Sequence, residues 1–555
     1  MKVLHIISGG THAHLLSLLK ELNKQIEVDL ICRRETDFSR EVEALGIPIT
    51  VFSDGFSSSI NQIKAMIRGG GYDLVHCHGN RANYIGSVLK RSFDMPFVCT
   101  VYSDCRKDYH DSLFSRMSYG TLSSRALRKM DYRICLSEQM RSTLIERGFD
   151  PNDIFSIHNS AELSAKNTCR RQIEIYNAIL KRRREGRSGV VICGSYGHGN
   201  AGDEAILTAL IRQLHGIDPD MRITVVSKNP AHTLMEHDVH SISRTAFGKF
   251  RRELKKSKLY INGGGSLIQD VTSRRSLFFY LYTIKTAKGC GCLVQMYGCG
   301  IGPLNFKNDR KLSRRIIENN VDAITLRDPE SIKTLREIGV TKPEISLGAD
   351  PVLGIGACDE SDIDYFMRKN GLEPNCSYVC LSLRPWAGFI EKSHEIAAAL
   401  DICSSVLGFT PVFLPMNYGQ DLPTAQLIAS MLKCRSIILP EIESPELAIG
   451  LMSKMKLVVA MRLHTLLYAA CSRTNSVGIS YDPKVVSFAD YAGIRCIDFE
   501  RVNTEDLARE IRAAYHGANY SEYMRSLAQL KASEKINIQT ARRLLEANEG
   551  DKRND

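Results

Sequence analysis

Basic and imidazole side chains follow predicted strands in the second half of the chain. Arg327 closes the apolar run DAITL, and Arg462 and His464 follow LVVAM and open an apolar helix. Lys484 lies in a polar turn after VGIS. A small anion that carries both a carboxylate and a phosphate needs several cations, and histidine is the side chain best able to deliver a proton near neutral pH. Together these four residues predict a site for such an anion.

Each of these side chains also has a simpler explanation when it is taken alone. Arg327 could form a salt bridge with Asp328 or Glu330, and a lysine in a turn is usually only solvated. Arg462 and His464 are more specific, because the free backbone N–H groups of a helix start lie beside them. If the cationic residues face solvent separately instead of one cleft, a non-catalytic glycan-binding protein is the better interpretation.

Four glycine-rich segments also follow predicted strands in this part of the chain. They are GSYGHGNAGDE at 194–204, INGGGSLIQD at 261–270, YGCGIGPL at 297–304 and LGADPV at 347–352. Glycine lets the backbone approach a ligand closely, and ligands of open α/β sheets bind outside the carboxyl ends of the strands. A tight turn would explain any one of these segments, but four of them together predict a single lined cleft.

The first of these segments has the glycine spacing of a dinucleotide fingerprint, at Gly197, Gly199 and Gly202. That fingerprint requires an acid at the end of the next strand to bind a ribose, and RITVVSKN provides none. Asp203 and Glu204 would also lie where a pyrophosphate binds. An NAD-type cofactor is therefore disfavoured. The two acids fit a favourable interaction with the helix dipole as well as bonding to sugar hydroxyls, and both explanations stay open.

The composition is that of an ordinary globular protein with a moderate excess of basic residues. The 73 Lys and Arg exceed the 62 Asp and Glu, and the net charge of +11 favours anionic partners such as a phosphorylated small molecule, anionic lipid or nucleic acid. The 17 cysteines lack the repeated pairs of a zinc site, so reduced thiols are expected. We find neither a secretory signal nor an apolar stretch of the roughly 18 residues that cross a membrane. A cytoplasmic protein is predicted, and peripheral association with the inner face of the membrane stays open.

Short β-branched runs alternate with amphipathic stretches along most of the chain, which predicts parallel sheets with helices on both faces. The series restarts twice, so we expect an α/β protein of three doubly wound, Rossmann-like units. The predicted borders are a first domain at 1–162, a basic linker at 163–188, a second domain at 189–375 and a third at 376–545. The charged helical tail from Tyr520 is expected to pack back on an earlier domain.

Several long motifs between residue 189 and about 500 carry a family resemblance. They are GSYGHGNAGDEAIL, NGGGSLIQDVTSRRSLFFYL, GCGIGPL, DAITLRDPES, LGADPV, and AMRLHTLLYAA followed by YDPKV. This region resembles the polysaccharide pyruvyl transferases, especially the CsaB type that pyruvylates secondary cell-wall polymers in bacteria with S-layers. The resemblance implies a GT-B-like pair of Rossmann-type domains, phosphoenolpyruvate as co-substrate, no cofactor and no metal.

The same resemblance implies the reaction and the residues that perform it. Pyruvate would pass from phosphoenolpyruvate to a cell-wall sugar of the N-acetylmannosamine type, on a lipid-linked glycan, as a ketal with release of phosphate; no nucleic acid is implied as a partner. The implied catalytic residues are His464 as the acid/base, Arg327 and Lys484. The implied substrate-binding residues are Arg462, Leu463, Ser195, Asn200, Gly202, Asp203, Glu204, Gly264 and Gly265.

Residues 1–160 resemble the acceptor-side domain of family 4 glycosyltransferases, through DLVHCHGNRANYIG, TVYSDCRKDY, ICLSEQM and IHNSAE. The sugar-nucleotide domain that would follow in those enzymes has no counterpart here. We expect this region to bind the acceptor glycan or its lipid carrier, or to contact the membrane. His76 and His78 could be packed strand-end residues or ligand contacts. A sugar-nucleotide-dependent GT-B glycosyltransferase stays open as the alternative activity, because both halves have GT-B-like character.

Overall fold

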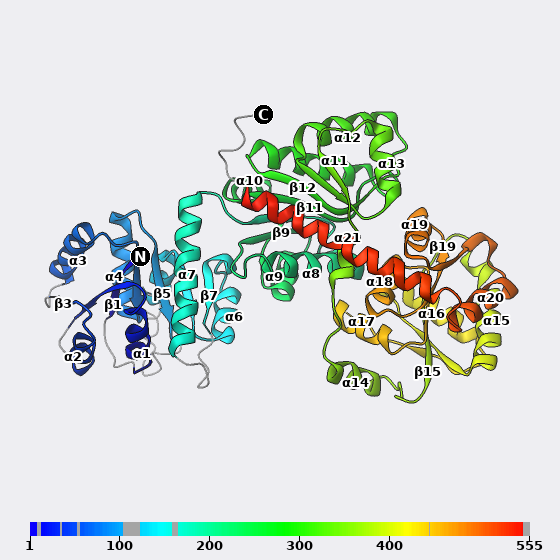
Figure 1. Ribbon diagram of the computed structural model, residues 1–555, viewed down its shortest axis with the longest axis horizontal. Coiled ribbons are helices and arrows are strands. Elements are labelled where there is room, and N and C mark those ends of the chain that lie inside the picture. The colour runs from blue at the N-terminus through cyan, green and yellow to red at the C-terminus, as the bar shows by residue number, and fades with distance from the viewer. Residues whose placement is uncertain are drawn as a thin grey trace. The chain divides into compact units, whose positions relative to one another are not determined.

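The computed structural model describes residues 1–7, 13–33, 36–52, 56–103, 122–157, 165–442 and 444–547. The chain divides into two compact units, Met1–Arg187 and Ser188–Asp555, and Figure 1 shows their helices and strands. Most of TVYSDCRKDY and nearly all of IHNSAE lie outside the described residues. Within the described residues, no helix combines the length and the apolar character that crossing a bilayer requires.

The first unit contains a seven-stranded parallel sheet in the order β3-β2-β1-β4-β5-β6-β7. Two of its inner strands, Leu74–His78 and Phe97–Val101, are buried throughout, as helices on both faces require. The strands are β1 Lys2–Ile7, β2 Glu27–Cys32, β3 Ile49–Val51, β4 Leu74–His78, β5 Phe97–Val101, β6 Tyr132–Cys135 and β7 Ile154–Ser156. The helices are α1 Ala13–Leu22, α2 Asp37–Ala44, α3 Phe56–Gly70, α4 Asn80–Leu89, α6 Glu138–Glu146 and α7 Ala165–Glu185.

Helix α7 corrects the prediction of a basic linker at 163–188. One face of the helix is apolar, and Ile175, Tyr176 and Ile179 are fully buried in a core that also contains residues of β1, β4, β5 and β6. Arg182, in the basic run, stacks over the rings of Tyr132 and Phe155. The segment therefore belongs to the first unit. Its many charges obscured an apolar stripe at helical spacing.

The second unit contains two parallel sheets, which we call the middle sheet and the last sheet. The middle sheet has seven strands in the order β10-β9-β8-β11-β12-β13-β14. Its strands are β8 Val190–Cys193, β9 Ile223–Ser227, β10 His240–Ser243, β11 Leu259–Ile268, β12 Leu293–Ile301, β13 Ala323–Leu326 and β14 Glu344–Leu347. Its helices are α8 Ala201–His215, α9 Pro230–His237, α10 Phe247–Lys256, α11 Arg274–Gly289, α12 Lys307–Asn320 and α13 Pro329–Ile338, followed by the 3₁₀ helix η3 Pro351–Gly354.

The last sheet has six strands in the order β17-β16-β15-β18-β19-β20. Its strands are β15 Ser377–Ser382, β16 Phe409–Phe413, β17 Ile437–Ile438, β18 Leu457–Ala460, β19 Ser476–Ser480 and β20 Arg495–Asp498. The helices are α14 Glu360–Lys369, α15 Phe389–Leu407, α16 Tyr418–Met431, α17 Pro445–Ser453, α18 Leu463–Ser472, α19 Pro483–Ala492, α20 Thr504–Tyr515 and α21 Tyr520–Glu546. In all three sheets the first strand lies inside and the chain winds outward in both directions. The predicted fold class, three doubly wound α/β units, is therefore confirmed.

The two sheets of the second unit share one hydrophobic core. Ile206 of α8 and Leu466 of α18 belong to the same buried cluster. Ile363 of α14 joins that cluster too, so this helix packs with the last sheet although the predicted border follows it. Helix α21 runs along both sheets (Figure 1): Tyr523 is buried with the last sheet and Ala541 with the middle one. The prediction of a tail that packs on an earlier domain is confirmed.

Candidate active site

The candidate residues of the second unit follow the carboxyl ends of strands in both sheets. In the middle sheet, Ser195 follows β8, Gly265 lies in the second half of β11 and Arg327 follows β13. In the last sheet, Arg462 follows β18 and Lys484 lies beyond β19. The chain reverses its winding direction beside β8 and again beside β15, and ligands of such sheets bind at these points. The strand order thus places the candidate site residues at the ligand-binding edge of each sheet.

His464 is the centre of a charged cluster. It lies in the first turn of α18 and is partly buried. Burial is the main cause that lowers the pKa of His464 to about 4. The charge of Asp350 opposes this effect, and three cations act with burial: Arg327, Lys484 and Arg462. The fold therefore brings the four sequence-predicted residues close enough to influence one another, although they come from three strand ends.

The ring of His464 packs against the start of α8, so the two sheets meet at this residue. A Cβ atom added to Gly202 would lie 2.0 Å from Nδ1 of His464, which leaves no room for any side chain at that position. The other ring nitrogen, Nε2, is buried and has no hydrogen-bond partner. An unpaired buried polar atom costs about 1–3 kcal/mol, and a ligand that bonded to Nε2 would remove this cost.

Arg327 is a buried cation that the protein holds in place. Its Nη1 donates to Asp350 at 2.9 Å and its Nη2 to the hydroxyl of Ser266 at 3.1 Å. Burial alone would lower the pKa of Arg327, but the carboxylates of Asp350 and Asp328 outweigh this effect and the pKa is raised. The salt bridge to Asp328 that sequence reasoning offered as an alternative exists, at 3.8 Å, and Asp350 is a closer partner that the sequence did not indicate. It fixes the guanidinium instead of removing it from the cluster.

Arg462 is fixed in the same way by a carboxylate that the sequence analysis missed. Its Nε donates to Asp421 at 3.0 Å and its Nη2 donates to the second oxygen of that residue. Asp421 is fully buried and also accepts from the backbone N–H groups of Met416 and Asn417. It lies in the first turn of α16, the helix that follows β16. Its position after a predicted strand was the only signal in the sequence.

Lys484 is the most exposed cation of the cluster. It lies in the first turn of α19, and its side chain is 40% exposed. Its Nζ lies 3.3 Å from Asp482, which caps the same helix. A long side chain with one exposed partner keeps the freedom to turn toward an incoming anion.

Asp203 and Glu204 are adjacent but have different surroundings. Burial raises the pKa of Asp203 to about 6, while Asn200, which donates to it at 2.7 Å, and the cation Arg327 act in the opposite direction. Asp203 therefore shares a charged neighbour with His464. Glu204 accepts instead from the backbone N–H of Gly197 at 2.8 Å, and burial raises its pKa to about 7. Glu204 therefore stabilises the glycine-rich segment at 194–204, whereas Asp203 belongs to the charged cluster.

The remaining predicted residues support this arrangement. Gly264 and Gly265 have positive φ angles of 62° and 70°, and a Cβ on Gly264 would lie 2.0 Å from the side chain of Ile206. They let α8 pack closely on β11. Ser195 lowers the pKa of Asp203, against the effect of burial. Leu463 is an apolar core residue that is 6% exposed, so only its backbone is suited to polar contact with a ligand.

A cleft of about 810 Å³ adjoins the charged cluster. Pro329 and Glu330, close behind Arg327, line one part of it. Trp386, Tyr481 and further residues that follow β15, β19 and β20 line the rest. The cleft is thus built from both sheets, and the sequence analysis named none of its lining residues as site residues.

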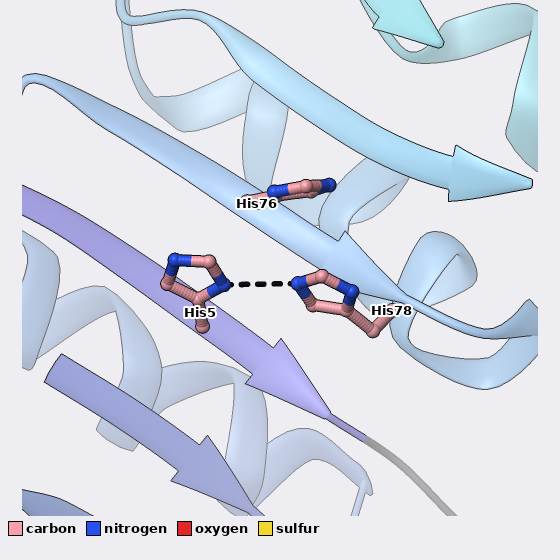
Figure 2. Close-up of side chains that lie close together, drawn as sticks. All are labelled: His5, His76 and His78. Carbon is pink, nitrogen blue, oxygen red and sulfur yellow. Dashed lines mark hydrogen bonds between the residues drawn. The ribbon is translucent and has the colours of Figure 1, made fainter. Parts of the chain in front are cut away.

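The first unit contains a second group of histidines: His5, His76 and His78 (Figure 2). All are buried, and ring nitrogens of the three lie within 4.8 Å of one another, a spacing that would suit a metal ion. Both nitrogens of His76 are already hydrogen-bonded, at 2.6 Å to the hydroxyl of Tyr176 and at 2.8 Å to that of Thr100. His5 and His78 bond to each other at 2.9 Å. For His76 and His78, these contacts favour packed strand-end residues over ligand contacts.

Comparison with known proteins agrees with this division of the chain. A family model described as glycosyltransferase family 4 matches residues 8–165, and one described as polysaccharide pyruvyl transferase matches residues 200–483. The fold and these matches define a polysaccharide-modifying transferase. The second match spans slightly more than half of the chain, so the chain belongs to the polysaccharide pyruvyl transferase family. Arg327, Arg462 and His464 lie inside the matched range, and Lys484 lies one residue beyond it.

Similar solved structures have low sequence identity. The UDP-GlcNAc 2-epimerase from Methanocaldococcus jannaschii is 13% identical, with 63% of this chain and 99% of that chain covered and a TM-score of 0.46. A glycosyltransferase from Rickettsia africae is 10% identical, with coverages of 65% and 100% and a TM-score of 0.45. The ADP-heptose heptosyltransferase II of E. coli is 11% identical, with coverages of 60% and 99% and a TM-score of 0.37. Comparison with curated proteins gives no match.

Proposed function

We propose that the second unit transfers the pyruvyl group of phosphoenolpyruvate to two hydroxyls of one sugar in a cell-wall polysaccharide precursor, where it becomes a cyclic ketal. The observation that carries this proposal is the grouping of Arg327, Arg462 and Lys484 around His464, with Asp203 close to Arg327 and Lys484. The family membership supports the same reaction class. The phosphoenolpyruvate donor, the ketal product and a lipid-linked N-acetylmannosamine-type acceptor are parts of the proposal.

The cations bind the two anionic groups of the donor. Phosphoenolpyruvate carries a carboxylate and a phosphate, and guanidinium groups bind both through paired hydrogen bonds. Asp350 and Asp421 hold Arg327 and Arg462 in fixed positions before the donor arrives. Cations oriented in advance stabilise developing charge without reorganisation during the reaction. Lys484, the most exposed of the three, follows the phosphate as it leaves.

Proton transfer depends on His464, which is neutral at pH 7 before the donor binds because its pKa is lowered to about 4. A bound phosphate brings negative charge to the cluster and thereby favours the protonated ring. Donor binding thus favours protonation of His464, which then donates this proton to the methylene carbon. Asp203, whose pKa is raised to about 6, is the complementary group that accepts a proton from a sugar hydroxyl.

The bonds balance without a cofactor. Protonation of the methylene turns it into a methyl group and leaves the neighbouring carbon electron-poor. One sugar hydroxyl attacks this carbon, the carbon–oxygen bond to phosphate breaks, and a second hydroxyl of the same sugar closes the ketal. Of the two protons that the hydroxyls lose, one compensates for the proton in the methyl group and the other leaves with the phosphate.

The test uses the full-length protein with phosphoenolpyruvate and a panel of lipid-linked disaccharides, and follows phosphate release and product mass together. The proposal requires one phosphate for each product that gains a pyruvyl ketal. A parallel panel of sugar nucleotides tests the alternative, a GT-B glycosyltransferase. Nucleotide release with transfer of the sugar, and no use of phosphoenolpyruvate, would refute the proposal.

We also propose that the first unit binds the lipid-linked acceptor at the cytoplasmic face of the membrane. Its family 4 match and the exposed basic residues of α7, Arg170, Lys181 and Arg184, support this role. Basic residues near an anionic lipid surface contribute about 1 kcal/mol each, and salt screens this attraction. Co-sedimentation with anionic liposomes at low and high salt tests it. Binding that is equal at both salt concentrations, or no binding, would contradict the electrostatic part.

A further inference from the structure

The cleft beside the charged cluster differs from it in charge. Of the lining residues, five are acidic and none is lysine or arginine; the acids are Glu330, Asp482, Asp490, Asp498 and Glu500. Such a lining offers many acceptors for hydroxyl donors, and its five acids outnumber the one guanidinium that stacks on its aromatic residues, Arg384. A volume of about 810 Å³ is typical of small-molecule sites and exceeds what a three-carbon donor requires. The cleft therefore fits a neutral molecule that is rich in hydroxyl groups.

The wall of the cleft carries an exposed aromatic pair. Trp386, the only tryptophan of the chain, is 43% exposed, and its ring lies 4.7 Å from that of Tyr481 at an angle of 54°. Arg384 lies over both rings, at 5.5 Å from Trp386 and 4.6 Å from Tyr481, and donates to the Tyr481 hydroxyl at 2.7 Å. The pair is thus held in place, and the Trp386 ring stays partly exposed where it lines the cleft. The C–H face of a pyranose packs on such a ring because the π face is negative.

Both walls of the cleft are continuous with the cations of the cluster. Asp482 accepts from the backbone N–H of Lys484 at 3.0 Å and lies 3.3 Å from its Nζ. On the opposite side, Glu330 lies in the first turn of α13, three residues after Arg327. A sugar ring in the cleft would therefore present its hydroxyls next to the bound donor, as transfer to two hydroxyls of one ring requires.

We infer that this cleft is the acceptor subsite, and that it binds a neutral sugar ring stacked on Trp386 with its hydroxyls donating to the surrounding carboxylates. The inference rests on the proposed function for its assignment to the acceptor. Its physical content, a neutral-sugar site on Trp386, holds independently of pyruvyl transfer. The N-acetyl group of an acceptor sugar is uncharged and fits the same lining, whereas a uronic acid does not.

The single tryptophan provides a binding assay that needs no turnover. The full-length protein is titrated with a soluble disaccharide glycoside that ends in N-acetylmannosamine, and the tryptophan fluorescence is followed. We expect a saturable change in fluorescence. The affinity for a matched disaccharide that ends in a uronic acid should be at least fivefold lower. No change with the neutral sugar, or equal affinity for both sugars, would overturn the inference.

Kinetics separate this inference from the proposed function. We expect Trp386→Ala to raise the acceptor KM about tenfold, because aromatic stacking contributes roughly 0.5–1.5 kcal/mol beyond area burial. The KM for phosphoenolpyruvate should change less than twofold, and Trp386→Phe should restore most of the loss. The control is Tyr365→Ala, which removes an aromatic that is 66% exposed on α14. An unchanged acceptor KM in Trp386→Ala overturns the subsite even if the enzyme transfers pyruvate, whereas saturable sugar binding without any pyruvyl transfer refutes the proposed function alone.

Discussion

His76 in the first unit and His464 in the second both lie near the carboxyl end of a parallel strand, and burial lowers the pKa of both. Their surroundings differ. Both ring nitrogens of His76 are bonded to neutral hydroxyl groups, whereas Nε2 of His464 has no partner and four charged residues act on its ring. The position of a histidine in a sheet therefore does not reveal its role. The charges around the ring reveal it, since an unpaired buried nitrogen also occurs at Nε2 of His5 in the first unit.

The largest expected effect is that of His464→Ala on turnover. We expect kcat to fall at least about 100-fold, because general acid catalysis is typically worth that much or more. The ring is only partly buried, so the thermal unfolding temperature should stay within a few degrees of the parent protein. Steady-state kinetics and circular dichroism measure the two quantities. Activity near the parent level with the histidine gone would remove it from the mechanism.

Arg327→Lys should have the next largest effect, although it keeps the charge. A lysine cannot reproduce the simultaneous contacts of the guanidinium with Asp350 and Ser266, so the cation would no longer be fixed for the donor. We expect kcat/KM for phosphoenolpyruvate to fall about tenfold or more. Arg336→Lys on α13, at a residue near the surface, is the control. Unchanged donor kinetics would mean that Arg327 serves only the salt bridge.

His76→Ala should have the opposite pattern, a loss of stability without a loss of turnover at saturating soluble acceptor. Removing the ring takes one hydrogen-bond partner from the Thr100 hydroxyl and one from Tyr176, which keeps its contact with Gln172, and an unsatisfied buried group costs about 1–3 kcal/mol. Hydrogen exchange in β4 and β5 reports on the first unit alone. A drop in kcat comparable to that of His464→Ala would contradict the difference between the two histidines, because it would indicate a catalytic role for the buried histidines of the first unit.

The same group predicts a pH dependence for the first unit. Burial holds the pKa of His5 at about 3 and that of His76 well below its usual value, so the unfolded chain takes up protons near pH 6.5 that the folded chain does not. Because the unfolded state binds more protons, acidification favours unfolding. The free energy of unfolding falls by about 1.4 kcal/mol per pH unit for each histidine. Protection of β4 should decrease below about pH 6.5, and less steeply in His76→Ala. Constant protection from pH 7 to 5 would contradict this assignment.

The smallest expected effect on chemistry is that of removing the first unit. A chain that begins at Arg187 keeps every residue of the charged cluster, and the second unit has its own core. We expect turnover with a soluble acceptor to stay within about twofold of the full chain, and use of a lipid-linked acceptor to fall. A folded but inactive second unit would mean that the first unit shapes the active site.

Much of the architecture could be predicted from the sequence because alternating apolar runs determine strands and helices locally. The cations could be identified for a related reason, since strand ends in parallel sheets gather at one edge. The carboxylates that hold them could not. Asp350 and Asp421 meet Arg327 and Arg462 across 23 and 41 residues of sequence, and no local pattern encodes such pairs.

Two other features were missed for physical reasons. The buried face of α7 is hidden among charges, and its partners are strands far away in the sequence. The aromatic wall of the cleft joins Trp386 and Tyr481 from two loops, and an exposed aromatic residue in a loop has no periodic signal. Asp203 and Glu204 look equivalent in the sequence, and only the packing of α8 shows that one faces the cations and the other the glycine loop.

The most direct test of the central claim, that the second unit protonates phosphoenolpyruvate and forms a ketal, is to run the reaction in D₂O and examine the product by NMR. The account predicts a ketal whose methyl group contains solvent deuterium. This ketal should form at the same rate as phosphate is released. The His464→Ala variant should form it at least about 100-fold more slowly. A product that keeps an intact methylene group, or phosphate release without any sugar product, would contradict it.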